Sequence, residues 1–186
     1  MIFQKEPYDL IYIMKEYEED DSDHIYSYLY RFVSTDNGLT YILRAEYHKG
    51  DVFGIKFYAK PHAKSKKKYS LLTNKGYALR VLQTCGSVIP LLLKDYPMAS
   101  FGLIGSRLLD EEREEIEVPQ RNIRFRIYEK VAKDLFGEKT FEHYSYSKIS
   151  GYLLINKRNN IEQAKEEIER MFIHNYRDIH NYEDLI

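Results

Sequence analysis

The sequence contains few of the features that mark disulfide-rich, membrane-spanning or strongly basic proteins. Cys85 is its one cysteine, so no disulfide can form within the chain. No apolar run approaches the length that a helix needs to cross a bilayer. The 28 lysine and arginine residues nearly balance 29 aspartate and glutamate residues, which gives a net charge of -1. A surface that is basic everywhere is therefore excluded, and any site for nucleic acid must be local.

The chain has 186 residues, of which 44% are hydrophobic and 31% charged, and these values predict one domain with a substantial core. We expect an N-terminal segment (1–24), a core (25–157) and a C-terminal helix with a tail (158–186). Residues 1–20 lack the basic and apolar regions of a secretory signal. Together with the single cysteine, this predicts a cytoplasmic protein. Cys85 lies among apolar positions, so we expect a core side chain rather than a nucleophile.

Three segments between Ile25 and Ala59 alternate between apolar and polar residues. The turns TDNG and HKGD, each with a glycine, separate them, so they are typical of a three-stranded antiparallel meander. The third segment is expected to place two sets of side chains on opposite sides of the sheet: Phe53, Ile55, Phe57 and Ala59 on one, and Lys56, Tyr58 and Lys60 on the other. Residues 7–19 fit either a short helix or a strand.

Apolar residues recur at helical spacing over residues 75–96, which predicts a buried helix that Thr73 or Asn74 caps. Pro90 is expected to kink it, because the proline ring crowds the carbonyl of Gly86. A strand (99–104), a second helix (121–136) and two further strands follow. A last helix begins after Asn160 and runs to about Tyr176.

A helix between two strands of one sheet allows a parallel crossover. We therefore expect an α/β (α+β) domain with a mixed sheet that is antiparallel in its first half and parallel at its centre. This element order resembles the GNAT N-acyltransferase superfamily over roughly residues 25–157, with an extra C-terminal helix. The resemblance implies an acyl-CoA cofactor, such as acetyl-CoA, whose pyrophosphate lies on the turn between the fourth strand and the next helix.

The pyrophosphate turn of that superfamily reads Arg or Gln, two residues, Gly, one residue, Gly or Ala. Residues 73–78, TNKGYA, look similar, with Thr73 at the Arg or Gln position. A helix N-terminus there would offer unpaired amides and a favourable dipole to an anion. The resemblance implies that four residues hold the pyrophosphate: Lys75, Gly76, Tyr77 and Ala78.

The second helix of the superfamily often begins with Asn and carries a Tyr about two turns later, and Asn122 and Tyr128 are similar to this pair. The resemblance implies that Tyr128 protonates the departing CoA thiolate while an unidentified base deprotonates an acceptor amine. Arg107 and Arg124 could clamp a phosphate or carboxylate nearby. The alternatives are a buried tyrosine with a satisfied hydroxyl, and arginines that pair with the acidic loop at 109–118.

A lysine cluster supports a second hypothesis, a non-catalytic module that binds nucleic acid or a protein. Tyr69 would be available for stacking against a base, and TNKGYA would then be an ordinary helix cap. The lysines are Lys64, Lys66, Lys67 and Lys68. A third hypothesis is self-association through a sheet edge or the last helix.

Two further observations bear on the function. The six histidines show no metal-ligand spacing, so we expect no metal site. The sequence also resembles an uncharacterised group of small bacterial proteins in which an Asn-Lys-Gly turn opens a helix, and this likeness implies no activity.

Overall fold

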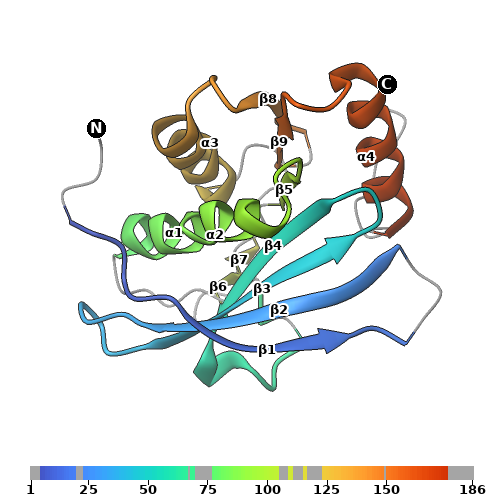
Figure 1. Cartoon of the computed structure of the whole chain (residues 1–186). Coiled ribbons are helices and arrows are strands. Elements are labelled where there is room, and N and C mark those ends of the chain that lie inside the picture. The colour runs from blue at the N-terminus through green and yellow to red at the C-terminus, as the bar shows by residue number, and fades with distance from the viewer. Residues whose placement is uncertain are drawn as a thin grey trace.

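The computed structural model describes residues 5–19, 23–66, 68–69, 77–104, 109–110, 115–116, 123–148 and 150–175. Within them, seven strands form one sheet in the order β1-β2-β3-β4-β5-β9-β8, and helices pack on both of its faces (Figure 1). The sheet strands are β1 (Ile11–Tyr17), β2 (His24–Val33), β3 (Thr40–His48), β4 (Val52–Ala59), β5 (Ser100–Ile104), β8 (Phe141–Tyr146) and β9 (Gly151–Asn156). The helices are η1 (Lys60–His62), α1 (Ala78–Gly86), α2 (Val88–Asp95), α3 (Ile123–Phe136) and α4 (Ile161–Asn175). A separate short pair consists of β6 (Leu109–Asp110) and β7 (Glu115–Ile116).

The antiparallel meander is confirmed as β2, β3 and β4. Its two turns use backbone conformations that favour glycine, with φ of +71° at Gly38 and +81° at Gly50. Asp51, which follows Gly50, also has a positive φ of +56°. On β4 the side chains alternate as expected, because Phe53 and Ile55 are buried in the main core.

The ambiguous segment at 7–19 forms an edge strand, β1, which pairs antiparallel with β2. Its apolar side chains include Ile11, Tyr12, Ile13 and Met14, each more than 40% exposed. The register shifts between Tyr12 and Met14, and such a bulge disfavours pairing with another strand edge.

The predicted helix over 75–96 is divided at Ser87 into α1 and α2. The interruption lies three residues before Pro90, which has no N–H to donate to the Gly86 carbonyl. The proline therefore ends one helix and stands in the first turn of the next. The expected caps Thr73 and Asn74 lie outside the described residues, and Tyr77 occupies the N-cap position of α1.

The other helices agree with the sequence. Gly137 follows α3 with a φ of +54°, as a left-handed helix end requires. The Asn160 side chain accepts a hydrogen bond from the Gln163 amide at 3.3 Å, which caps α4. Cys85 is buried, with 4% exposed.

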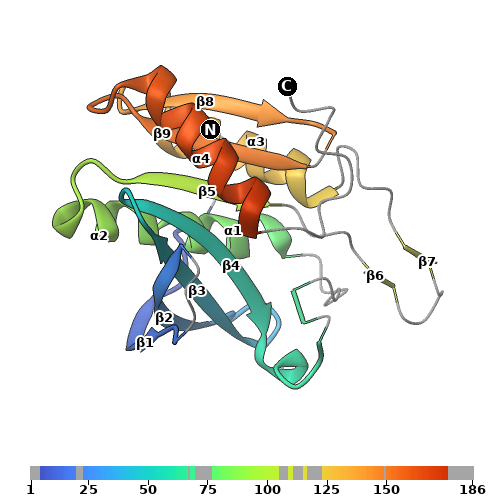
Figure 2. The same cartoon turned by 90° about the vertical axis from the view of Figure 1, so that its right-hand side faces the viewer.

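Helices α1, α2 and α3 cover one face of the sheet, and α4 covers β5 and β9 on the other face (Figure 2). The main core lies under the first group and includes Phe32, Phe53, Phe101 and Leu154. A smaller core lies under α4 and includes Val52, Ile155 and Ile168. Beside α4 on the same face, β3 and β4 carry the charged residues Arg44, Glu46 and Lys56.

The mixed sheet is confirmed. Among the described strands, β4 and β5 form the one parallel pair, and every other pair is antiparallel. Helices α1 and α2 make the crossover between these two central strands.

Candidate functional site

The parallel strands β4 and β5 separate after a short stretch of pairing. Their register includes three pairs and ends where Gly54 lies opposite Gly102. Strand β4 then continues to Ala59, and β5 ends at Ile104. Figure 2 shows β4 curving away from β5 beyond this point. The end of the pairing is therefore the place at which a ligand could lie between the two strands.

Side chains fill the gap on the face that α1 and α3 cover. Phe57 of β4, Leu103 of β5 and Tyr128 of α3 line an apolar cavity of about 20 Å³, which is roughly the room that one water molecule needs. Leu82 and Cys85 of α1 also line it. In this conformation the gap has no room for an acyl chain, so a ligand would have to move the Phe57 and Leu103 side chains.

Tyr128 is the predicted catalytic residue that the structure places in this gap. It is 7% exposed and packs with Leu82 and Val131. The aromatic ring thus belongs to the apolar layer between α1 and α3, as the alternative interpretation of a buried tyrosine expected.

The other predicted cofactor residues are only partly described. Tyr77 and Ala78 form the exposed start of α1, and Arg124 is the second residue of α3. Lys75, Gly76 and Arg107 lie outside the described residues. Whether these groups meet one ligand therefore stays a prediction.

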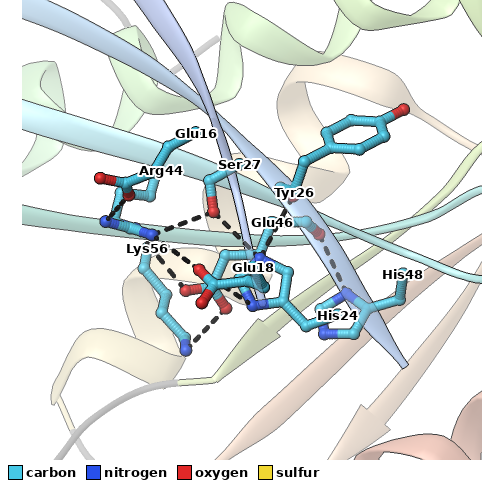
Figure 3. Close-up of polar contacts among 9 residues, drawn as sticks. All are labelled: Glu16, Glu18, His24, Tyr26, Ser27, Arg44, Glu46, His48 and Lys56. Atoms are coloured by element: carbon cyan, nitrogen blue, oxygen red, sulfur yellow. Dashed lines mark hydrogen bonds and ion pairs between the residues drawn. The ribbon is translucent and has the colours of Figure 1, made fainter. Parts of the chain in front are cut away.

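A cluster of charged residues lies on the opposite face of the sheet, where β1 to β4 are beside α4 (Figure 3). The Arg44 guanidinium is at its centre, 2.8 Å from a Glu16 carboxylate oxygen and 3.4 Å from one of Glu18. The Glu46 carboxylate lies 2.7 Å from Lys56 Nζ. Both Arg44 and Glu46 are largely buried, with side chains 16% and 8% exposed.

The position of Glu46 links this cluster to the gap. Glu46 is in register with Gly54 of β4, and Gly54 is in register with Gly102 in the last β4–β5 pair. The carboxylate therefore lies beside the end of the parallel pairing, on the face opposite Tyr128.

Opposing effects set the protonation of Glu46. Burial opposes its ionisation, but the charge and hydrogen bond of Lys56, together with smaller effects of His24 and His48, outweigh burial, so the pKa of Glu46 is lowered. A carboxylate of this kind stays ionised at neutral pH and is a weak base. Its contribution to a reaction would be electrostatic.

Two histidines complete the cluster. The rings of His24 and His48 stack with centroids 5.2 Å apart. His48 Nδ1 lies 3.0 Å from the Glu46 carbonyl oxygen, and His24 Nε2 lies 3.0 Å from Ser27 Oγ. Burial and the neighbouring His24 lower the pKa of His48, so the neutral form of this ring is favoured.

Sequence reasoning missed this cluster, although a signal was present. Arg44 and Glu46 alternate with Leu43 and Ala45 along β3, and the latter two are fully buried in the main core. What the pattern does not show is that β1 and β2 bring Glu16, Glu18 and His24 to the same place.

The lysine cluster of the second hypothesis is described in part. Lys64 and Lys66 are exposed, whereas Lys68 Nζ lies over two rings, 4.6 Å from the centroid of Tyr58 and 5.3 Å from that of Tyr69. Lys67 lies outside the described residues. The Tyr69 ring thus already has a cation of its own chain against it.

The last findings concern membrane-spanning helices and similarity to known proteins. Among the described residues, no helix is long and apolar enough to cross a membrane. No protein-family model matches the chain, and no curated protein or solved structure matches it significantly.

Proposed function

We propose that this protein binds an acyl-CoA at the separation of β4 and β5 and transfers its acyl group to an amine. The observation that carries the proposal is the presence of Tyr128 among the side chains that fill the gap where β4 and β5 separate, after Gly54 and Gly102. A hydroxyl there would be able to protonate a thiolate that leaves from a ligand between the strands.

Two further features support the same proposal. The crossover from β4 to β5 leads into α1, whose start at Tyr77 and Ala78 belongs to the TNKGYA segment. A pyrophosphate at that start would meet helix N–H groups and the positive end of the helix dipole. Across the sheet, on the face opposite Tyr128, Glu46 supplies a buried negative charge beside the end of the β4–β5 pairing.

The proposal requires the gap to open. Because the cavity holds about 20 Å³, an acyl group would displace Phe57 and Leu103, and its apolar surface would replace part of their contacts. The neighbouring Cys85, the one cysteine of the chain, would report this opening. Its alkylation rate should change when acetyl-CoA binds.

Thermal-shift titration with acetyl-CoA tests the cofactor. Binding should raise the melting temperature in a concentration-dependent manner. Gly76→Asp should abolish the shift, because a carboxylate at the helix start would repel the pyrophosphate. Ser147→Asp adds the same charge to an exposed turn and should leave the shift unchanged. No shift at millimolar acetyl-CoA, or equal shifts in all three proteins, would refute acyl-CoA binding at this turn.

The Tyr128→Phe variant tests the catalytic role. It keeps the ring in its apolar layer and removes only the hydroxyl, so acetyl-CoA should still bind. Release of free CoA thiol in the presence of a panel of amines should fall by about a hundredfold, as expected when a general acid is lost. An unchanged rate would leave Tyr128 a packing residue.

A second candidate function rests on the exposed lysines. Lys60, Lys64 and Lys66 are exposed along one short segment that follows β4, and such a segment could contact a nucleic-acid backbone. The expected result is oligonucleotide binding that weakens steeply with salt and is lost when Lys64 and Lys66 become glutamate. If neither single-stranded nor duplex oligonucleotides bind at low salt, a protein partner is the version of this hypothesis that remains.

A further inference from the structure

A groove of about 430 Å³ lies between the turn that joins β3 to β4 and the first turns of α4. Its volume falls within the range of small-molecule sites. It is on the α4 face of the sheet and shares no lining residue with the cavity at Tyr128. The binding proposed below is therefore independent of the proposed acyl-CoA function.

The floor of the groove is apolar. Val52 of β4 and Ile168 and Met171 of α4 line it, and the same three side chains belong to the hydrophobic cluster that fixes α4 to the sheet. The floor is therefore held in place by packing, while the flexible Met171 side chain can adapt to a bound shape.

The rim of the groove is charged. Asp23 and Lys49 line one side of it, with a carboxylate oxygen of Asp23 3.4 Å from Lys49 Nζ. Glu167 of α4 also lines the groove, and its carboxylate accepts a hydrogen bond from Gln163 at 2.9 Å. Two carboxylates and one ammonium give the rim an excess of one negative charge.

The ion pair on the rim can be replaced. The Lys49 side chain is 66% exposed and that of Asp23 35% exposed, and exposed pairs of this kind contribute little to stability. A competing cation can therefore take the place of Lys49 beside Asp23 at small cost. An anion would find one ammonium and two repelling carboxylates.

We propose that this groove binds a small amine that carries an apolar group. The apolar group packs on Val52, Ile168 and Met171, and the ammonium is held at the Asp23 and Glu167 carboxylates. The ligand needs both its apolar group and its ammonium group. The apolar floor buries the first, and the excess negative charge of the rim favours a positively charged ligand.

Titration of the full chain, followed by NMR, with four small probes tests the inference. 3-Methylbutan-1-amine should bind, whereas methylamine lacks the apolar group, 3-methylbutan-1-ol lacks the charge, and 3-methylbutanoate has the opposite charge. Each of these three should bind at least about fivefold more weakly, which is the effect of roughly 1 kcal/mol. Equal affinity for the amine and the alcohol would overturn the proposal, and so would the absence of amine binding at about 10 millimolar.

Variants locate the site and separate it from nonspecific binding. Asp23→Asn and Glu167→Gln should each lower the affinity for the amine by about fivefold. Neither should change the affinity for the alcohol. Ala164→Phe places a ring into the groove and should lower the affinity for both the amine and the alcohol. Glu166→Gln is the matched control, because Glu166 is 70% exposed and pairs with Arg170. The groove is not the site if Glu166→Gln lowers the affinity for the amine as much as Glu167→Gln does. The same conclusion follows if Asp23→Asn and Glu167→Gln leave that affinity unchanged.

Discussion

Phe172 of α4 lies directly against Gly102 of β5. A Cβ atom placed on Gly102 would be 2.1 Å from Phe172 Cζ and 2.7 Å from its Cε2. The absence of a side chain at Gly102 therefore lets the aromatic ring lie on the sheet at the end of the β4–β5 pairing. We expect Gly102→Ala to reduce the free energy of unfolding by about 1–3 kcal/mol, the usual effect of overpacking, as measured by urea denaturation.

A double variant shows whether the ring is the cause. Phe172→Ala removes the obstacle, so Gly102→Ala should be much less destabilising in that background than in the wild-type chain. Additive effects of the two substitutions would contradict the contact as the source of the destabilisation.

The Glu46–Lys56 pair should be sensitive to the loss of either partner. Lys56→Met leaves the buried Glu46 carboxylate without its 2.7 Å partner, so the free energy of unfolding should fall by about 1–3 kcal/mol at pH 7. Lys157→Met is the matched control, because the Lys157–Glu142 pair is more exposed, at 36% and 44%, and should contribute less than about 1 kcal/mol.

The effect of Lys56→Met should depend on pH. In the wild-type chain the pKa of Glu46 is lowered, so its stabilisation is present above the ordinary glutamate value of about 4.3 and is lost as the pH falls through the folded value. Without Lys56 the pKa of Glu46 rises, so the buried carboxylate is protonated at a higher pH than in the wild-type chain. The difference in the free energy of unfolding between the wild type and Lys56→Met should therefore narrow below about pH 4.3. A difference that stays constant with pH would argue against this ion pair.

His48 should make the protein less stable in mild acid. Burial and His24 lower its pKa in the folded chain, so below about 6.5 the unfolded chain binds a proton that the folded chain does not. The free energy of unfolding should thus decrease from about pH 6.5 downward, and less steeply in His48→Gln. His174→Gln, at an exposed position of α4, should keep the wild-type slope. Parallel pH profiles for wild type and His48→Gln would refute this assignment.

Tyr96 should act as a link between α2 and the sheet. Its hydroxyl lies 2.7 Å from that of Tyr26 and 2.8 Å from that of Tyr28. Tyr96→Phe should lower the free energy of unfolding by about 1–2 kcal/mol, because two part-buried hydroxyls lose a partner. Tyr77→Phe, at a residue 42% exposed, should change it by less than about 0.5 kcal/mol. Equal effects in both variants would contradict the role of Tyr96.

Local sequence patterns were sufficient to predict the central elements of the fold. The meander follows from alternation between two glycine-containing turns, and Gly38 and Gly50 adopt the positive φ that such turns require. The parallel pairing of β4 and β5 follows from the helix that joins them. These features depend on neighbours in sequence, so they can be deduced without the structure.

Other features depend on partners that are distant in sequence. The pattern of residues 7–19 fits either a helix or a strand. The apolar side chains of this edge strand stay exposed, so packing against a core does not impose a helical or strand spacing on them. The division of the long helix at Ser87 reflects the Gly86 carbonyl that Pro90 leaves without its usual donor, and the pattern predicted only a kink.

Of the candidate site, the sequence pattern predicted the position of Tyr128 alone. Tyr128 falls on the apolar stripe of α3, so its inward position could be deduced. Arg44 and Glu46 could not be linked to Glu16 and His24 from sequence, since the register of β1 with β2 brings them together. The groove beside α4 was equally hidden, because its two sides are more than a hundred residues apart.

The central claim is that an acyl-CoA lies between β4 and β5, and hydrogen exchange of the full chain with saturating acetyl-CoA tests it most directly. The account predicts slower amide exchange in peptides that cover β4 after Gly54, in β5 and in the turn of α3 that carries Tyr128. Exchange that is unchanged in all three regions at millimolar acetyl-CoA would contradict it.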